Sequence, residues 1–143
     1  GRKLCGTLTE IKAEIDLIEY VVLGIGLNVN LEASDFGPEL KSVATSLYLE
    51  LGRKQERLPL FQKIMAELET WYECWQEKGF APVRRAWKEA NITLGCPVQV
   101  NSWQEVFQGL AVDIDAEGAL LVRGAGGEIR RFNSGEVTLS PTG

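Results

Sequence analysis

Lys3 and a glycine-rich strand face are the residues of this chain whose types and spacing best fit a binding site. Alternate positions of V-V-L-G-I-G-L-N-V-N place Gly24, Gly26 and Asn28 on one face of a predicted strand. Glycine and asparagine are depleted in strands unless a ligand or another backbone comes close. Lys3 would add a fixed positive charge for a carboxylate or phosphate, and the Asn28 amide can donate and accept hydrogen bonds. The pattern indicates an anionic ligand lying against the backbone.

A purely structural interpretation fits the same residues. Lys3 would then be a solvated strand end, the glycines would mark a β-bulge, and Asn28 and Asn30 would cap the strand where it enters a loop. Taken alone, the residues favour this structural interpretation over the binding one.

Other catalytic chemistries lack their residues. The chain has no histidine and no C-x-x-C pair, which excludes most zinc sites and every histidine-dependent triad. It also has no P-loop and no serine nucleophile elbow. The turn and the two strand faces around it would scatter the carboxylates of Glu14, Asp16 and Glu19, so no metal site is predicted. The three cysteines are expected to be reduced thiols, in a cytoplasmic protein.

Length and composition predict a folded protein of one ordinary domain or two small ones. The chain has 143 residues, a net charge of −5 and 45% hydrophobic residues. An acidic balance argues against nucleic-acid binding, so the pairs Arg84-Arg85 and Arg130-Arg131 are expected to be solvated. The longest apolar run, 20–27, is too short to cross a membrane, and no signal peptide is visible.

Two strands that form a hairpin must position the candidate site. Strands are predicted over 3–12 and about 17–29, with a turn near 14–16. Paired residue numbers would then sum to roughly 30, which places Lys3 opposite about Leu27. The face opposite the glycines is apolar and should lie under helices; it carries Val21, Leu23, Ile25, Leu27 and Val29.

A loop over 31–42, helices and short strands follow the hairpin. The A-T-S-L segment should begin an ordered element, and a helix is predicted over 60–78, between Pro59 and Gly79. Its apolar stripe is interpreted as core, together with a second helix over 82–90. A domain boundary near Asn91 separates 1–91 from 92–143. In the second part, five strands predict a small antiparallel barrel packed on the first part: 97–101, 105–114, 119–123, 128–132 and 136–139.

The motifs of this chain, in their order, resemble those of the biotin protein ligases. In the first part these are K-L-C-G-T-L-T-E at 3–10, V-V-L-G-I-G-L-N-V-N at 21–30 and A-T-S-L at 44–47. In the second part they are L-G-x-x-V-x-V at 94–100, G-L-A-V-D-I-D at 109–115, G-A-L-L-V at 118–122 and S-G-E-V at 134–137. Each motif is short, but together they cover nearly the whole chain.

The resemblance implies a fold and an activity. The fold would be α+β, with part of a mixed or antiparallel sheet covered by helices on one face, then an all-β barrel of the Src-homology-three type. The family joins biotin to ATP, with Mg²⁺ as the activating ion, and passes biotin from biotinyl-5′-AMP to a lysine of the biotin carboxyl carrier protein of acetyl-CoA carboxylase. Lys3 would be catalytic, while Gly6, Gly24 and Gly26 would face biotin and Asn28 the adenylate.

Two family segments do not occur in this sequence: the glycine- and arginine-rich loop that folds over biotin, and W-P-N-D before the catalytic lysine. The resemblance is therefore to the C-terminal part of a ligase, whose isolated segment should be inactive. It leaves open whether such a ligase carries DNA-binding helices and whether it forms a homodimer. The alternatives are a lipoate-ligase-like acyl transferase and a non-catalytic interaction module.

Overall fold

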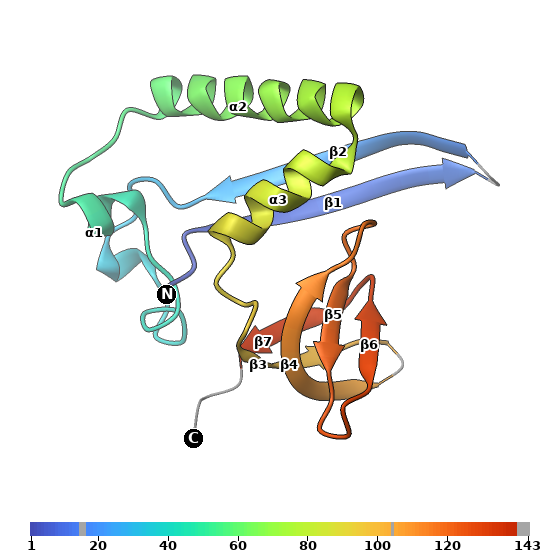
Figure 1. Ribbon diagram of the computed structural model, residues 1–143. Helices are drawn as coiled ribbons and strands as arrows, with labels where there is room; N and C mark the ends of the chain where they lie inside the picture. The colour runs from blue at the N-terminus through green and yellow to red at the C-terminus, as the bar shows by residue number, and fades with distance from the viewer. Residues whose placement is uncertain (15–16, 104, 140–143) are drawn as a thin grey trace. The chain divides into compact units, whose positions relative to one another are not determined.

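The chain, seen here in a computed structural model, forms two compact units, one over residues 1–65 and one from residue 66 onward. The structure describes residues 1–14, 17–103 and 105–139. The first unit contains strands β1 (Cys5–Glu14) and β2 (Leu17–Leu27), the short 3-10 helix η1 (Ala33–Asp35), helix α1 (Leu47–Leu51) and the start of helix α2 (Arg57–Lys78). The second contains the rest of α2, helix α3 (Phe80–Ala90) and five strands (Figure 1). These elements confirm the α+β class.

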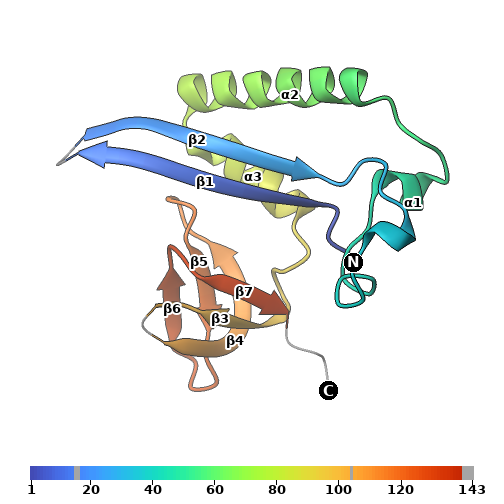
Figure 2. The same cartoon turned by 180° about the vertical axis from the view of Figure 1, so that it is seen from behind.

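Strands β1 and β2 pair in an antiparallel hairpin whose register differs from the predicted one. Cys5 lies opposite Leu27, where Lys3 had been expected. The register also shifts between Lys12 and Ala13, and no glycine, proline or asparagine there indicates this irregularity in the sequence. The turn was predicted near residues 14–16, and residues 15 and 16 lie outside the described residues. Because the difference from the predicted register is two residues, the paired residues between Cys5 and Lys12 keep their predicted faces. Strand β2 ends at Leu27, so Asn28 and Val29, which were predicted to lie in the strand, come after it. Figure 2 shows the two strands side by side along their length.

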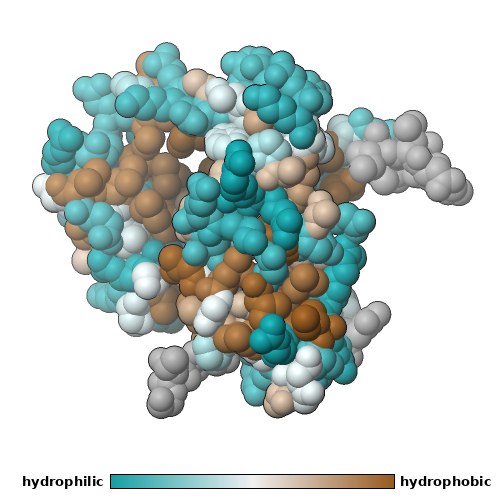
Figure 3. Space-filling view, in the orientation of Figure 1, coloured by the Kyte–Doolittle hydropathy of each residue, from teal (hydrophilic) through white to brown (hydrophobic). Residues whose placement is uncertain are grey.

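Most of the apolar side chains predicted to be buried are exposed. Val21 and Leu23 of β2 are 54% and 47% exposed, and Trp75 in the stripe of α2 is 52% exposed. Apolar side chains accordingly reach the surface in Figure 3. The stripe lies on a helix close to the predicted one, with Gly79 at its end at φ +71°. Periodicity determines which side chains share a face, whereas burial requires a partner surface.

The five strands of the second unit form the predicted curved antiparallel sheet. They are β3 (Pro97–Asn101), β4 (Val106–Ile114), β5 (Leu120–Arg123), β6 (Ile129–Phe132) and β7 (Glu136–Leu139), in the order β6-β5-β4-β3-β7. Five side chains fill its core: Val98, Val100, Phe107, Ala111 and Val122. Each strand lies within one residue of its prediction, because turn residues separate all five.

Helix α3 is fastened to strand β4 by its basic side chains. The Arg84 Nε donates to the Ile114 carbonyl at 2.8 Å, and Arg84 also pairs with Asp113 at 3.1 Å. Lys88 reaches the other oxygen of Asp113 at 2.8 Å. The prediction that Arg84 is merely solvated is therefore wrong, because it is half-buried and joins two elements. Residues 66–91 group with the barrel, and the domain boundary at Asn91 stays a prediction.

The described residues of the chain contain no helix that combines the length and the apolar character needed to cross a membrane.

Candidate functional site

The backbone of Lys3 pairs with the segment 43–45 and not with β2. Its N–H donates to the Val43 carbonyl at 2.6 Å, and its carbonyl accepts from the Thr45 N–H at 2.9 Å. These bonds make a parallel bridge between Lys3 and Ala44. Lys3 therefore stands just before β1, and the A-T-S-L segment fixes its main chain.

The side chain of Lys3 lies over Gly6. A β-carbon placed on Gly6 would be 3.5 Å from the lysine Cε and 3.6 Å from its Nζ. Gly6 is paired with Gly26, and Gly24 is opposite Leu8, so the three glycines share one face of the hairpin. We call Gly6, Gly24 and Gly26 the glycine strip. The strip leaves backbone uncovered, with an ammonium group at one end.

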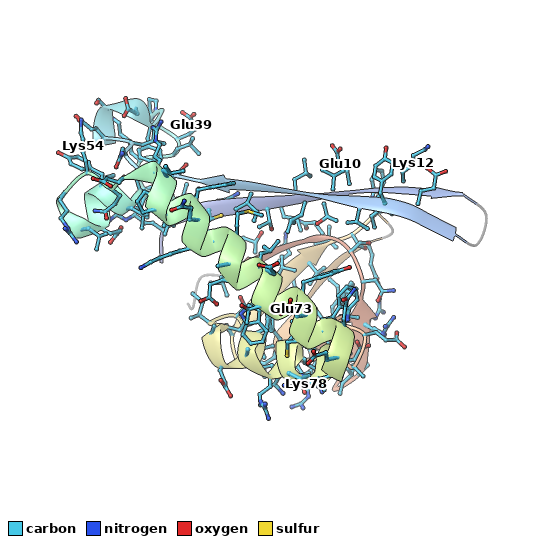
Figure 4. The ribbon with its side chains drawn as sticks, turned by 90° about the horizontal axis from the view of Figure 1, so that it is seen from above. Glu10, Lys12, Glu39, Lys54, Glu73 and Lys78 are labelled. Carbon is cyan, nitrogen blue, oxygen red and sulfur yellow. The ribbon has the colours of Figure 1, made fainter. Side chains whose placement is uncertain are left out.

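The character of this face changes along the hairpin. Glu10 and Lys12 continue it beyond Leu8, and Figure 4 shows both side chains pointing to the same side of the hairpin. Lys12 pairs with Glu19 at 2.6 Å. Among the described residues, no carboxylate lies within ion-pair distance of the Lys3 ammonium. The end of the face near Lys3 can thus attract an anion, whereas the far end carries its own counter-charges.

Asn28 connects the end of β2 to the A-T-S-L segment. Its side-chain Nδ2 donates to the Thr45 carbonyl at 3.0 Å, and its own carbonyl accepts from the Leu47 N–H at 3.0 Å. Asn30 likewise exchanges two hydrogen bonds with the backbone of Gln55. The strand-capping role considered for both asparagines is present. The glycines do not mark the bulge, which lies at Lys12 and Ala13.

Sequence reasoning did not identify the two residues that hold this arrangement together, Thr45 and Glu50. Thr45 is 3% exposed, and its hydroxyl donates to the Glu50 carboxylate at 2.5 Å. Glu50 also accepts from the Arg2 guanidinium at 2.8 Å. The Thr45 hydroxyl is the largest cause of the lowered pKa of Glu50, and Arg2 adds to it. The A-T-S-L motif marked the position of Thr45, but no local pattern indicated its partners.

The buried Ser46 anchors the same segment. It is fully buried, donates to the Leu31 carbonyl at 2.5 Å and accepts from the Leu49 N–H at 3.1 Å. This second bond caps helix α1, which ends at Gly52 with φ +67°. The segment that carries Thr45 is therefore held on both sides.

Metal ligands are not clustered in the part of the chain that the structure describes. No three side chains of His, Cys, Asp or Glu come together there. Asp16, one member of the carboxylate group considered above, lies outside the described residues. What the arrangement offers chemically is a fixed cation beside exposed backbone, which suits a negatively charged group with a flat or extended tail.

Comparisons with known proteins point to one family. Residues 93–140 match the family described as "Biotin protein ligase C terminal domain". The "Bifunctional ligase/repressor BirA" of Bacillus spizizenii is 36% identical over 139 residues, which are 97% of this chain and 42% of the relative. The "Biotin--[acetyl-CoA-carboxylase] ligase" of Mycobacterium tuberculosis is 31% identical over 140 residues, 96% of this chain and 48% of the relative.

The fold agrees with these relationships. The structure "Biotin protein ligase from Aquifex aeolicus in complex with biotin and ATP" is similar with a TM-score of 0.79 and 25% identity, over 99% of this chain and 57% of that one. The chain spans less than half the length of the curated relatives described above.

Proposed function

We propose that this chain, which is related over nearly its whole length to the C-terminal part of the biotin protein ligases, supplies part of a biotin-adenylating site and the small barrel that follows it. The complete ligase would activate biotin with ATP to biotinyl-5′-AMP and transfer biotin to a lysine of a biotin carboxyl carrier protein. The relationship to the "Biotin--[acetyl-CoA-carboxylase] ligase" of Mycobacterium tuberculosis and the similarity to the Aquifex aeolicus structure with biotin and ATP support this assignment.

The observation that carries the proposal is the Lys3 ammonium lying over the bare backbone of Gly6. In adenylation a carboxylate oxygen of biotin attacks the α-phosphorus of ATP, the bond to the pyrophosphate oxygen breaks, and pyrophosphate leaves. The phosphoryl oxygens are negatively charged and repel the incoming carboxylate, which is also negatively charged. A positioned ammonium offsets this charge without rearranging, because its backbone is already fixed.

The other residues of the site have binding roles in this proposal. The glycine strip, Gly6, Gly24 and Gly26, lets the extended tail of biotin lie against the backbone, which side chains at these positions would cover. Asn28 would serve the adenylate end, and its side-chain Nδ2 also donates to the Thr45 carbonyl, which holds the segment that pairs with the Lys3 backbone. Mg²⁺ would arrive with the phosphates of ATP, whose charge it neutralises.

In the second step the carrier's lysine amine attacks the carbonyl of biotinyl-5′-AMP. An amide bond forms, the amine loses a proton, and AMP leaves with the electron pair of the broken bond. Lys3 has less charge to offset here, because the phosphate ester already exists. The two steps should therefore depend on Lys3 to different degrees.

The test is a pair of single-turnover assays on a complete ligase that contains this segment. In a Lys3→Ala variant, formation of biotinyl-5′-AMP should fall by roughly a hundredfold to a thousandfold, the usual effect of removing one preorganised electrostatic group. Transfer from preformed biotinyl-5′-AMP should fall less. Lys63→Ala, an exposed lysine of α2, is the matched control. Adenylation at the parental rate by a folded Lys3→Ala variant would refute the assignment.

A further inference from the structure

We propose that Glu50 is a positioning residue that holds Lys3 in register with the glycine strip. Its carboxylate links the residue before Lys3 in the chain to the residue that pairs with the Lys3 backbone. This inference rests on the proposed role of Lys3 in adenylation and adds a residue to that site.

One carboxylate oxygen makes both contacts. The Glu50 Oε1 accepts from the Arg2 Nη2 at 2.8 Å and from the Thr45 hydroxyl at 2.5 Å. Arg2 is the chain neighbour of Lys3. The Thr45 N–H, in turn, donates to the Lys3 carbonyl at 2.9 Å. Glu50 thus restrains the main chain of Lys3 from two directions, through the segment before it and through the segment beside it.

Thr45 uses all of its hydrogen-bonding groups in this arrangement. Its N–H binds the Lys3 carbonyl, its carbonyl accepts from Asn28, and its hydroxyl donates to Glu50. Because the Glu50 side chain is nearly half exposed, water could replace its carboxylate as the acceptor of the Thr45 hydroxyl. A water molecule is not tied to helix α1 or to Arg2, so it would not hold the segment in one position, and the segment could shift. Such a shift would move the bridge between Lys3 and Ala44.

Glu50 is itself held in place by a short helix. Its N–H donates to the carbonyl of the buried Ser46 at 3.1 Å. This bond fixes the backbone of Glu50 about one helical turn after Thr45, from where its carboxylate reaches the Thr45 hydroxyl. The Thr45 hydroxyl and Arg2 keep the pKa of Glu50 low, so the group is ionised at neutral pH. The ion pair with Arg2 is nearly half exposed, and such pairs add little stability by themselves. The contribution of Glu50 is to fix the position of the Lys3 backbone.

The experiment is a double-mutant cycle in a complete ligase that contains this segment. Glu50→Ala should lower the rate constant of biotinyl-5′-AMP formation by about tenfold to a hundredfold, the range expected when a reacting group is slightly misplaced. Transfer from preformed biotinyl-5′-AMP should change less. In a Lys3→Ala background, Glu50→Ala should have no further effect on adenylation, because there is no ammonium left to position. Glu56→Ala is the matched control.

A second pair of variants tests the same link without removing a charge. Thr45→Val keeps the shape of the side chain but removes the hydroxyl, and it should reduce adenylation in the same direction as Glu50→Ala. Thr45→Ser keeps the hydroxyl and should restore most of the rate. This pair also decides the matter if Glu50→Ala does not fold, as judged by circular dichroism.

The outcomes separate the two proposals. If Lys3→Ala leaves adenylation intact, the proposed function of Lys3 fails. If Lys3→Ala is impaired but Glu50→Ala adenylates at the parental rate, only the positioning role fails. An equal effect of Glu50→Ala with and without Lys3 would also overturn the positioning role, since Glu50 would then act independently. Equal rates for Thr45→Val and Thr45→Ser would contradict the hydroxyl link.

Discussion

The ammonium nitrogen of Lys3 lies 3.6 Å from the point at which a β-carbon on Gly6 would stand. That distance is an ordinary van der Waals contact, so a methyl group fits beneath the lysine without displacing it. A methyl group would nevertheless cover the backbone on which the biotin tail is proposed to lie. Stability and binding should therefore respond in opposite directions to one substitution.

Gly6→Ala should leave the fold intact and raise the free energy of unfolding slightly, by up to about 1 kcal/mol, because alanine restricts the unfolded chain. Biotin affinity of a complete ligase should fall by about tenfold or more, the effect of one misplaced methyl group in a binding site. Urea unfolding and calorimetric titration measure the two effects. Thr7→Ala, on the other face of the hairpin, is the control. Undiminished affinity in Gly6→Ala would place the biotin tail elsewhere.

Gly109→Ala should destabilise the barrel. A β-carbon on Gly109 would stand 2.3 Å from the Arg123 carbonyl oxygen and 2.8 Å from a methyl group of Val122, both in the neighbouring strand β5. Backbone on that side must move to make room, and overpacking of this kind costs about 1–3 kcal/mol. Urea unfolding of the 143-residue chain measures the loss.

The comparison for this variant is Gly24→Ala, whose β-carbon would stand 3.7 Å from its nearest neighbour. It should unfold at or above the urea concentration of the parent chain. Equal stability of the two variants would mean that β4 and β5 are not packed as the structure shows.

Asp113 should make the attachment of α3 to the barrel sensitive to acid. Hydrogen bonding from Lys88, with smaller effects from the Ile114 backbone and the charge of Arg84, lowers the pKa of Asp113. A carboxyl group with a lowered pKa stabilises the folded state above its unfolded pKa of about 3.9, and this contribution is lost as pH falls through the folded pKa. Asp113→Asn should reduce stability near pH 7 and flatten its decline below about pH 4.

Urea unfolding of the chain between neutral and acidic pH checks this expectation. The control is Glu89→Gln, which removes a carboxylate from α3. Glu89 takes no part in the two ion pairs that join α3 to Asp113. The Glu89→Gln variant should retain the parental pH profile. If Asp113→Asn and the parent lost stability in parallel on acidification, the pair with Lys88 would not contribute.

The isolated 143-residue chain should show little or no biotin-dependent exchange between ATP and pyrophosphate. It corresponds to less than half of the curated relatives described above, and a site assembled from part of its groups loses preorganisation. The measurement is incorporation of labelled pyrophosphate into ATP. Exchange that persists in a purified sample, and disappears in the Lys3→Ala variant, would show that the chain suffices.

Local signals predicted some parts of this fold well and others poorly. The barrel strands were found to within a residue because glycine, asparagine and serine separate them. The faces of the hairpin were correct, but its register was not, since the turn lacks an Asn-Gly or Asp-Gly signature and the irregularity at Lys12 has no local mark.

The candidate site shows the same limit. The residue types drew attention to Gly24 and Gly26 beside Lys3, but taken alone they favoured a structural interpretation. Gly6 and the catalytic role of Lys3 came from the resemblance to the biotin protein ligases, and both stay predictions. The sequence did not identify Thr45 or Glu50, because their roles come from contacts with residues distant in the chain. The periodicity of the α2 sequence also could not predict whether its apolar stripe is buried. Spacing indicates which side chains share a face of the helix, but not whether another element covers that face.

The bridge between Lys3 and Ala44 joins segments separated by a whole hairpin and a loop. Closing such a long loop costs chain entropy that local contacts do not repay, so this pairing should form after the hairpin during folding. By the same reasoning it should open before the hairpin does, and the Lys3 amide should exchange with deuterium through local openings. If the proposed role of Lys3 is right, a substrate held by its ammonium group would suppress those openings, and binding would be coupled to the completion of folding at this end of the strand.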